Sequence, residues 1–241
     1  MRTSTALPRL AVQPDLVERA YEAILDSICD GTLPGGTRLT QEELAERLDV
    51  SRQPVMQALL LLKRQGFVCD AGRRGVMVAP LEPAQVLHLY AIREALDGLA
   101  ARGAARRAGE AKRRGPAIIA AGRRAARSGA IAALVAADRE FHQLIYELSG
   151  NPLIADTLAF HWDHIRRIMG AVLRRDGAGE SVWDEHEAIL DAVIAGDGER
   201  AERLSRDHAR ISAGALTAAL ETGTAVPRSP MAEDKVLRRT Q

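Results

Sequence analysis

The chain has 241 residues, of which 46% are hydrophobic and 3% aromatic, and this length suits one large or two small domains. Its net charge of +1 gives no global argument for binding nucleic acid. The sequence contains no run of about 18 apolar residues and no apolar signal segment at its start, so we expect neither a membrane span nor secretion. Cys29 and Cys69 lie far apart, which indicates neither a disulfide framework nor a thiolate metal site and fits the cytoplasm.

Three short helices are expected near the N-terminus, after a disordered lead over residues 1–14. The first spans 15–31, and the turn-rich stretch TLPGGTRLT separates it from the second. The second helix, QEELAERLDV, is expected to begin with a capping box, in which Thr40 caps the helix and Glu43 follows three residues later. The third runs from an N-cap at Ser51 to a stop at Gly66.

The clearest strand signal lies directly after these helices. Two short β-prone runs, FVC and VMVA, flank AGRRG within residues 67–80, which is the pattern of a hairpin with Arg73 and Arg74 at its tip. Three short helices, the last two tightly joined, followed by a basic hairpin predict a winged helix-turn-helix over residues 15–80.

Residues 83–220 are expected to form an all-α antiparallel bundle of about six helices, which makes the whole chain mainly α. The helical runs are separated by the breaks RRGP, RSGA, SGNP, RDGAGE and AGDG. The remaining residues, 221–241, are polar and predict a disordered tail.

Positive charge is concentrated in two stretches of the chain. Residues 47–74 carry six basic and two acidic side chains, and residues 101–128 carry nine basic side chains against Glu110 alone. The first stretch includes the predicted third helix and hairpin, where cations can contact DNA. The second is more simply explained as a solvated helix face, and whether it touches DNA stays open.

Four polar side chains fall on apolar faces of the predicted helices. Asp138 and His142 are four residues apart on one such face, His186 lies on another, and His208 shares a third with Ile211. Burying these groups without partners would cost several kcal/mol, roughly 1–3 kcal/mol for each neutral one. A divalent metal satisfies all four at once, and three imidazoles with one carboxylate suit zinc, nickel or manganese better than calcium or magnesium.

Two regions of the chain carry family motifs. The segment RLTQEELAERLDVSRQPVMQALLLLKRQGFVCDAGRRGVMV resembles the winged-helix domain of the GntR superfamily of bacterial transcription regulators. The segments LYAIREALDGLAARGAA, DREFHQLIYELSGNP and EHEAILDAVIAGDGERAERLSRDH resemble the helical effector-binding domain of its FadR branch, the FCD domain. The resemblance covers roughly residues 15–215, and both domains match in the right order.

The resemblance implies a cytoplasmic homodimer that binds a near-palindromic operator in double-stranded DNA and senses a small organic acid. Repression is the usual mode of the family. Arg93 is expected to face the effector cavity and to pair with a carboxylate, and the alternative is a surface ion pair with Asp97, four residues on. The resemblance also implies a set of metal ligands: Asp138, His142, His186 and His208.

Contacts to DNA are expected from the start of the third helix and from the hairpin. In the major groove, Arg can fork onto guanine and Gln onto adenine, while a Ser hydroxyl suits a phosphate. Met56 stands where family members usually carry Arg, and Glu42 where some do, so either the operator differs from the family pattern or affinity rests more on Arg52, the hairpin and dimerisation. The expected contact residues are Ser51, Arg52, Gln53, Gln57, Arg73 and Arg74.

A metal-dependent hydrolase or lyase is the alternative interpretation, because an Asp/His₃ site with open coordination positions can activate water. The sequence shows no inward acid or base beside the set for proton transfer, and a winged helix has no role in such an enzyme. An architectural DNA-binding protein without an effector is a further alternative. We therefore expect a metabolite-responsive regulator, by family default a repressor, and not an enzyme.

Overall fold

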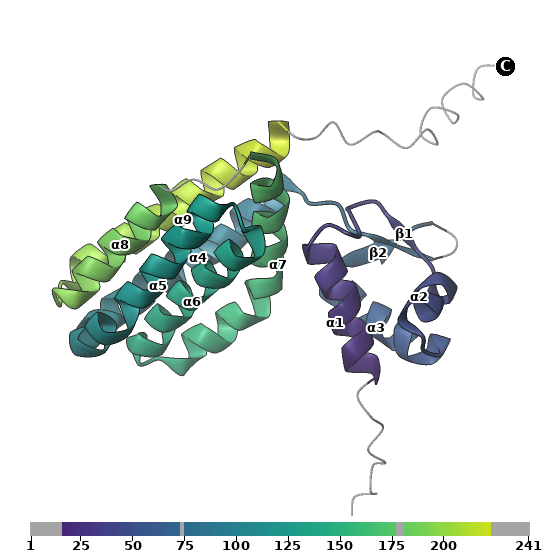
Figure 1. Ribbon diagram of the computed structural model, residues 1–241, viewed down its shortest axis with the longest axis horizontal. Coiled ribbons are helices and arrows are strands. Elements are labelled where there is room, and N and C mark those ends of the chain that lie inside the picture. The colour runs from purple at the N-terminus through teal and green to yellow at the C-terminus, as the bar shows by residue number, and fades with distance from the viewer. Residues whose placement is uncertain (1–15, 73–74, 177–180, 223–241) are drawn as a thin grey trace, which may run out of the picture. The chain divides into compact units, whose positions relative to one another are not determined.

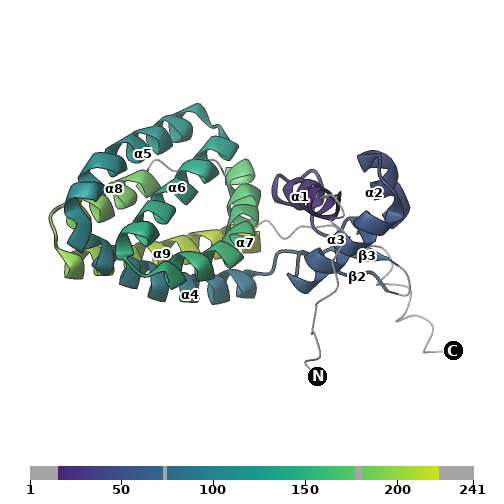
Figure 2. The same ribbon diagram turned by 90° about the horizontal axis from the view of Figure 1, so that it is seen from below.

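The computed structural model describes residues 16–72, 75–176 and 181–222 (Figures 1 and 2). The chain divides into two compact units, Met1–Pro80 and Leu81–Gln241. Among the described residues, no helix combines the length and the apolar character that a membrane span requires.

The first unit contains three helices and a small sheet, as predicted for a winged helix-turn-helix. The helices are α1 (Leu16–Cys29), α2 (Gln41–Leu48) and α3 (Arg52–Arg64), and the strands are β1 (Arg38–Leu39), β2 (Val68–Asp70) and β3 (Val76–Val78). The strands pair antiparallel in the order β1-β3-β2. Val55, Leu62 and Val78 have no exposed surface and lie in the core that the helices and the sheet share.

Strand β1 is a feature that the sequence analysis did not predict. It is only two residues long, and it pairs Arg38 with Met77 and Leu39 with Val76. Of the two residues of β1, only Leu39 is buried. A strand this short has no alternating pattern to detect, and it lies in a stretch rich in Gly and Pro that we interpreted as a turn.

The predicted helix starts differ in how they are capped. Thr40 caps α2 as expected, because its hydroxyl oxygen accepts a hydrogen bond from the backbone N–H of Glu43 at 3.2 Å. Ser51 occupies the N-cap position of α3, but its side chain makes no capping hydrogen bond. The Ser51 hydroxyl therefore stays available to a ligand at the start of this helix.

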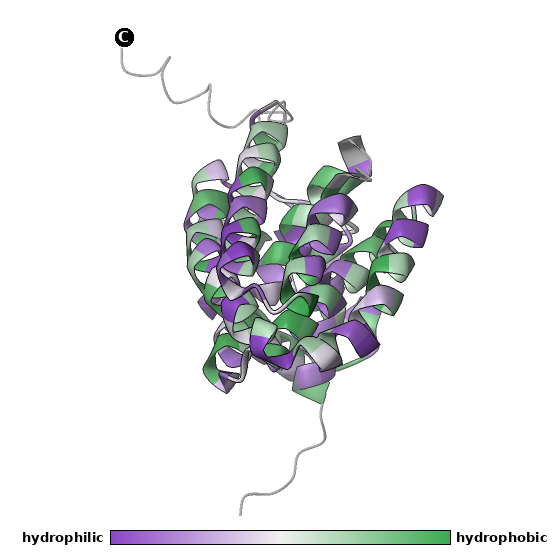
Figure 3. Ribbon diagram, turned by 90° about the vertical axis from the view of Figure 1, so that its left-hand side faces the viewer, coloured by the Kyte–Doolittle hydropathy of each residue, from purple (hydrophilic) through white to green (hydrophobic). Residues whose placement is uncertain are grey.

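The second unit is a bundle of six long helices and one short 3₁₀ turn. Helix α4 packs along α9 and α6, α8 packs against α9 and α5, and α7 packs against α6. Figure 3 shows hydrophobic and hydrophilic residues alternating along these helices, which is the pattern of amphipathic helices. The helices are α4 (Pro83–Ala104), α5 (Ala108–Ser128), α6 (Ile131–Ser149), α7 (Pro152–Asp176), α8 (Ser181–Ile194) and α9 (Gly198–Thr222).

The predicted break at RRGP is wrong. Helix α5 continues through Gly115 and Pro116, and the chain instead bends at the 3₁₀ turn Ala105–Arg107. Gly115 serves packing, since a Cβ atom at this position would meet both methyl groups of Leu190 on α8 at 2.5 Å. A glycine that lets two helices approach closely looks, in sequence, like a glycine that ends one.

Candidate metal centre and nucleic-acid interface

Three helices bring the four predicted ligands together. Helix α6 carries Asp138 and His142 one turn apart, α8 carries His186, and α9 carries His208. Their exposed fractions are 5% or less, so all four point into the bundle as expected. Ile211, which we placed on the same face as His208, is instead 56% exposed.

The candidate ligand atoms converge on one point. Nε2 of His186 lies 3.2 Å from Nε2 of His208 and 3.6 Å from Oδ1 of Asp138. Nε2 of His142 lies 3.9 Å from the same Asp138 oxygen. Ligands about 2.1 Å from one metal ion are roughly 3.0–3.4 Å apart in octahedral or tetrahedral geometry, so these separations need little adjustment. The three histidines could therefore hold a metal ion, and Oδ1 of Asp138 lies beside two of them.

Burial sets the protonation states that a metal requires. It lowers the pKa of His142 and of His186 well below 6.5, and the charge of nearby Arg93 lowers both further. Both rings are neutral at pH 7 and present lone pairs, as imidazole ligands must. Burial also raises the pKa of Asp138, and its Oδ2 atom has no hydrogen-bond partner among the described residues. An unsatisfied buried carboxylate oxygen fits a site built for a cation.

Aromatic rings fix the position of His186. Its ring lies 4.3 Å from the Phe141 ring and 4.8 Å from that of Trp183, measured between centroids. Trp183 has room because residue 122 on α5 is glycine, and a Cβ atom there would overlap the indole. The packing of α5 on α8 thereby sets the place of one candidate ligand.

Arg93 lies in the same buried site. Its Nη2 atom donates to Nε2 of His142 at 2.9 Å and lies 3.2 Å from Oδ2 of Asp97. The Tyr146 hydroxyl donates a hydrogen bond to Oδ1 of Asp97 at 2.7 Å. The centroid of the Tyr90 ring lies 4.8 Å from the guanidinium carbon of Arg93. Arg93 does form the expected ion pair with Asp97, but both side chains are buried. The alternative interpretation, an ion pair on the protein surface, is therefore wrong.

Burial by itself would lower the pKa of Arg93, but Asp97 together with Tyr90, Tyr146 and Asp138 outweighs this effect, and the pKa is raised. Arg93 is thus a permanent cation beside the histidine cluster. Its Nε atom has no hydrogen-bond partner among the described residues. A buried guanidinium with an unused N–H is suited to receiving an anion.

The sequence analysis missed some members of this site. Asp97 was considered only as a surface partner, and Tyr146 and Glu185 were not considered at all. Glu185 accepts a hydrogen bond from Nδ1 of His208 at 2.8 Å. These contacts join different helices, so periodicity along any one helix gives no sign of them.

The predicted DNA contacts of the third helix lie on one exposed surface. Arg52, Gln53 and Gln57 are exposed on α3, and Met56 between them is 40% exposed. Arg73 and Arg74, expected at the tip of the hairpin, lie outside the described residues. The opposite face of α3 carries Val55 and other core residues, so this helix can present its polar N-terminal turns to a ligand.

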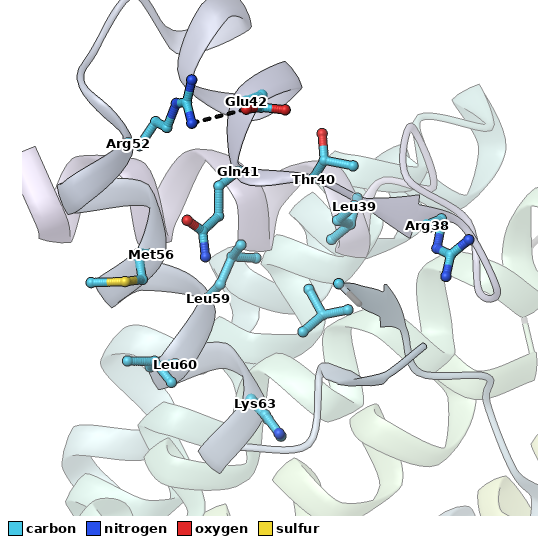
Figure 4. A pocket seen from close by; sticks show the side chains of 12 residues that line it. Arg38, Leu39, Thr40, Gln41, Glu42, Arg52, Met56, Leu59, Leu60 and Lys63 are labelled. Atoms are coloured by element: carbon cyan, nitrogen blue, oxygen red, sulfur yellow. Dashed lines mark ion pairs between the residues drawn. The ribbon is translucent and has the colours of Figure 1, made fainter. Parts of the chain in front are cut away.

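A pocket of about 470 Å³ lies between α2, α3 and the sheet (Figure 4). On its rim Nη1 of Arg52 lies 2.9 Å from Oε1 of Glu42, and both side chains are 68% exposed. Met56 and Leu60 line the same pocket with Lys63. The Glu42–Arg52 pair was not predicted, although Glu42 had been noted as a departure from the family pattern.

In the second basic stretch, 101–128, three basic side chains form ion pairs with acidic side chains on other helices. Arg102 lies 3.2 Å from Glu202, and Arg114 lies 2.8 Å from Glu147. Arg123 contacts both Asp184 and Glu187 on α8, the latter at 2.6 Å. These ion pairs favour the interpretation as a solvated helix face.

Comparison with known proteins places the chain in a family. Residues 16–78 match the family of bacterial regulatory proteins called gntR, and residues 88–210 match the FCD domain. The chain is a GntR-family regulator with an FCD domain. The resemblance noted in the sequence is therefore confirmed.

Relatives of this GntR-family regulator are transcriptional regulators and not enzymes. An HTH-type regulator of Streptomyces ambofaciens is 30% identical over 183 residues, 74% of this chain and 75% of the relative. The HTH-type transcriptional repressor RspR of Escherichia coli K12 is 26% identical over 192 residues, 79% of this chain and 84% of the relative. The chain is accordingly a DNA-binding transcriptional regulator.

Solved structures share its fold. Escherichia coli McbR/YncC superimposes with a TM-score of 0.69 at 19% identity, covering 86% of this chain and all of that one. A GntR protein from Rhodococcus sp. RHA1 gives a TM-score of 0.68 at 23% identity, covering 84% and 98% of the two chains. At these identities the likeness concerns the fold and not the ligand.

Proposed function

We propose that this GntR-family regulator is a metabolite-responsive repressor whose FCD domain binds a divalent metal and, beside it, a small carboxylate. The observation that carries the proposal is one buried site that combines converging ligand atoms with the cation Arg93. The name of the relative RspR supports repression as the mode.

The metal ligands in this proposal are Asp138, His142, His186 and His208. Zinc is the first candidate, with nickel and manganese next, because neutral imidazoles suit these ions. A bound metal would supply a Lewis-acidic position at which a carboxylate oxygen can bind. The chain itself supplies the enclosure, since the four side chains are buried and solvent has little access to them.

The lone pair on Nε2 of His142 links metal binding to carboxylate binding. In the structure it accepts a hydrogen bond from Nη2 of Arg93 at 2.9 Å. A lone pair donated to a metal can no longer accept this hydrogen bond, so the guanidinium gains a free N–H in addition to its unpartnered Nε. Arg93 is then ready to bind an anion.

Charge favours a carboxylate as that anion. A divalent metal and Arg93 would bring three positive charges into the site, and its fully buried carboxylates, Asp97 and Asp138, bring two negative charges; Glu185, 30% exposed, lies at the solvent-facing edge and is not counted. One positive charge remains in a region that excludes water, where unbalanced charge is costly. A small organic acid with one carboxylate restores neutrality and can pair bidentately with Arg93.

The DNA side of the proposal uses the first unit. A homodimer would place two α3 helices on the half-sites of a near-palindromic operator. Arg52, Gln53 and Gln57 would read bases and Ser51 would contact phosphate, with Arg73 and Arg74 reaching the adjacent groove or backbone. Effector binding changes DNA affinity by favouring another placement of the two DNA-binding domains.

Fluorescence anisotropy tests this function. The purified protein is titrated onto a fragment from upstream of its own gene and onto a scrambled fragment near physiological salt, with and without zinc. We expect at least a hundredfold preference for the upstream fragment and weakening of binding by one of a panel of small carboxylates. Equal binding to both fragments, or no response to any carboxylate in the metal-loaded protein, would contradict the proposal.

A further inference from the structure

The outer ring nitrogen of His208 lies within hydrogen-bond distance of a carboxylate, whereas the outer nitrogen of His142 lies 3.7 Å from Oδ2 of Asp97. Oε2 of Glu185 lies 2.8 Å from Nδ1 of His208, within hydrogen-bond distance. His208 is buried, whereas the Glu185 side chain is 30% exposed. The other ring nitrogen of His208, Nε2, faces His186 in the centre of the cluster.

The contact depends on how α8 and α9 pack. Glu185 immediately precedes His186 on α8, and two successive helical residues point in directions about 100° apart. His186 therefore enters the core, where it has no exposed surface, while Glu185 reaches across to α9. One helix supplies both a candidate ligand and the partner of a second candidate ligand.

A carboxylate at this distance fixes the tautomer of the imidazole. The carboxylate oxygen of Glu185 accepts the hydrogen bond at this distance, so Nδ1 of His208 carries the hydrogen. In the neutral ring the lone pair then lies on Nε2, the atom that faces the other ligands. A carboxylate behind a histidine ligand also restricts rotation of the ring and makes the coordinating nitrogen more basic.

We propose that Glu185 is a positioning residue for the metal centre, which holds the proton of His208 on Nδ1 and directs the Nε2 lone pair into the Asp138/His₃ cluster. This inference rests on the metal centre of the proposed function. Glu185 is not itself a proposed ligand, and its role is to orient the ring of His208.

The chain offers a matched control two residues away. Glu187 lies on the same helix and pairs with Arg123 at 2.6 Å, without contact to the cluster. Replacing Glu185 by Ala removes the acceptor, whereas Glu185→Gln keeps a neutral oxygen that can still accept from Nδ1. The Glu187→Ala variant reports the effect of losing a glutamate from α8 as such.

Two measurements on the full-length protein test the inference. Nitrogen-15 NMR of the histidine rings in the metal-free state reports the tautomer of His208, with His208→Asn used to assign its signals. Competition with a chromogenic chelator gives the Kd for zinc. In the wild type we expect His208 to carry its hydrogen on Nδ1, and in Glu185→Ala we expect a mixture of tautomers with zinc bound about 10–100-fold more weakly.

The controls make the result specific. Glu185→Gln should keep the Nδ1 tautomer and bind zinc more tightly than Glu185→Ala, and Glu187→Ala should match the wild type within about twofold. An unchanged tautomer and Kd in Glu185→Ala would overturn the role of Glu185 while leaving the metal centre in place. If the wild type binds no zinc, nickel or manganese, the proposed metal centre itself fails, and the role of Glu185 fails with it.

Discussion

His142 and His186 are almost completely enclosed, and their enclosure determines what they can do. A buried imidazole with a lowered pKa stays neutral at physiological pH and can serve as a metal ligand, whereas an exposed imidazole near pH 6.5 is divided between two forms. The surroundings of these two histidines thus decide their protonation state.

The first prediction concerns the stability of the metal-free protein. The unfolded histidines take up protons near pH 6.5, whereas folded His142 and His186 do not, so the unfolded state binds more protons as the pH falls. The free energy of unfolding should decrease between pH 7.5 and 5.5, by up to about 1.4 kcal/mol per histidine for each unit below 6.5. Urea denaturation over this range measures it.

Asp138 contributes with the opposite sign. Its pKa is raised above 3.8 in the folded state, so its contribution to stability is present below 3.8 and is lost as the pH rises through the folded-state pKa.

The control for the histidine prediction is a His142→Gln, His186→Gln double variant, whose free energy of unfolding should change less between pH 7.5 and 5.5. A wild-type profile that is flat over this range would contradict the assignment of two neutral buried rings.

The second prediction concerns Arg52. Its side chain is 68% exposed and held near Glu42, at the N-terminal end of α3. Replacing it by Ala should cost about 1–3 kcal/mol on the cognate operator and little on random DNA, because a base contact is lost. Anisotropy titrations on both DNAs measure the two changes, and equal losses would reduce Arg52 to a phosphate contact.

At the scale of helices, the sequence predicted some features well and others not at all. Burial of Asp138 and the three histidines could be predicted because periodicity places each on an apolar face, although the same pattern wrongly placed Ile211 there. Their union in one set was implied by the family resemblance. The Glu185–His208 contact, the Tyr146–Asp97 hydrogen bond and strand β1 depend on which elements become neighbours. Local sequence contains no information about that choice, and the same limit explains the wrong helix break at RRGP.

The third prediction tests the packing of α5 on α8. In Gly122→Ala the new methyl group would overlap the Trp183 indole, which packs against His186. We expect a loss of about 1–3 kcal/mol in the free energy of unfolding and weaker zinc binding, because a rigid ring must move.

Gly109 on the same helix provides the comparison. A Cβ atom there meets nothing within 4 Å, so Gly109→Ala should be neutral or stabilise by up to about 1 kcal/mol through helix propensity. Urea denaturation and chelator competition give both quantities. Equal stability of the two variants would show that Gly122 is not needed for the position of Trp183.

For the whole molecule, the family assignment and the geometry bear on different questions. The matches at residues 16–78 and 88–210 identify a transcriptional regulator, and they do not identify its ligand. The proposed carboxylate effector rests instead on the buried cluster, where a bound metal together with Arg93 would favour an anion. In the proposed mechanism, the coupling between the two units is the change in the free energy of DNA binding that effector binding produces.

The most direct test of this coupling is the effect of His208→Ala on metal content and on carboxylate-dependent release from the operator. Metal analysis and anisotropy are performed on the same preparations, with Glu187→Ala as the control. We predict that His208→Ala loses the metal and no longer responds to the carboxylate, while it still binds the operator. Unchanged metal content and unchanged release would contradict the central claim that this site senses the effector.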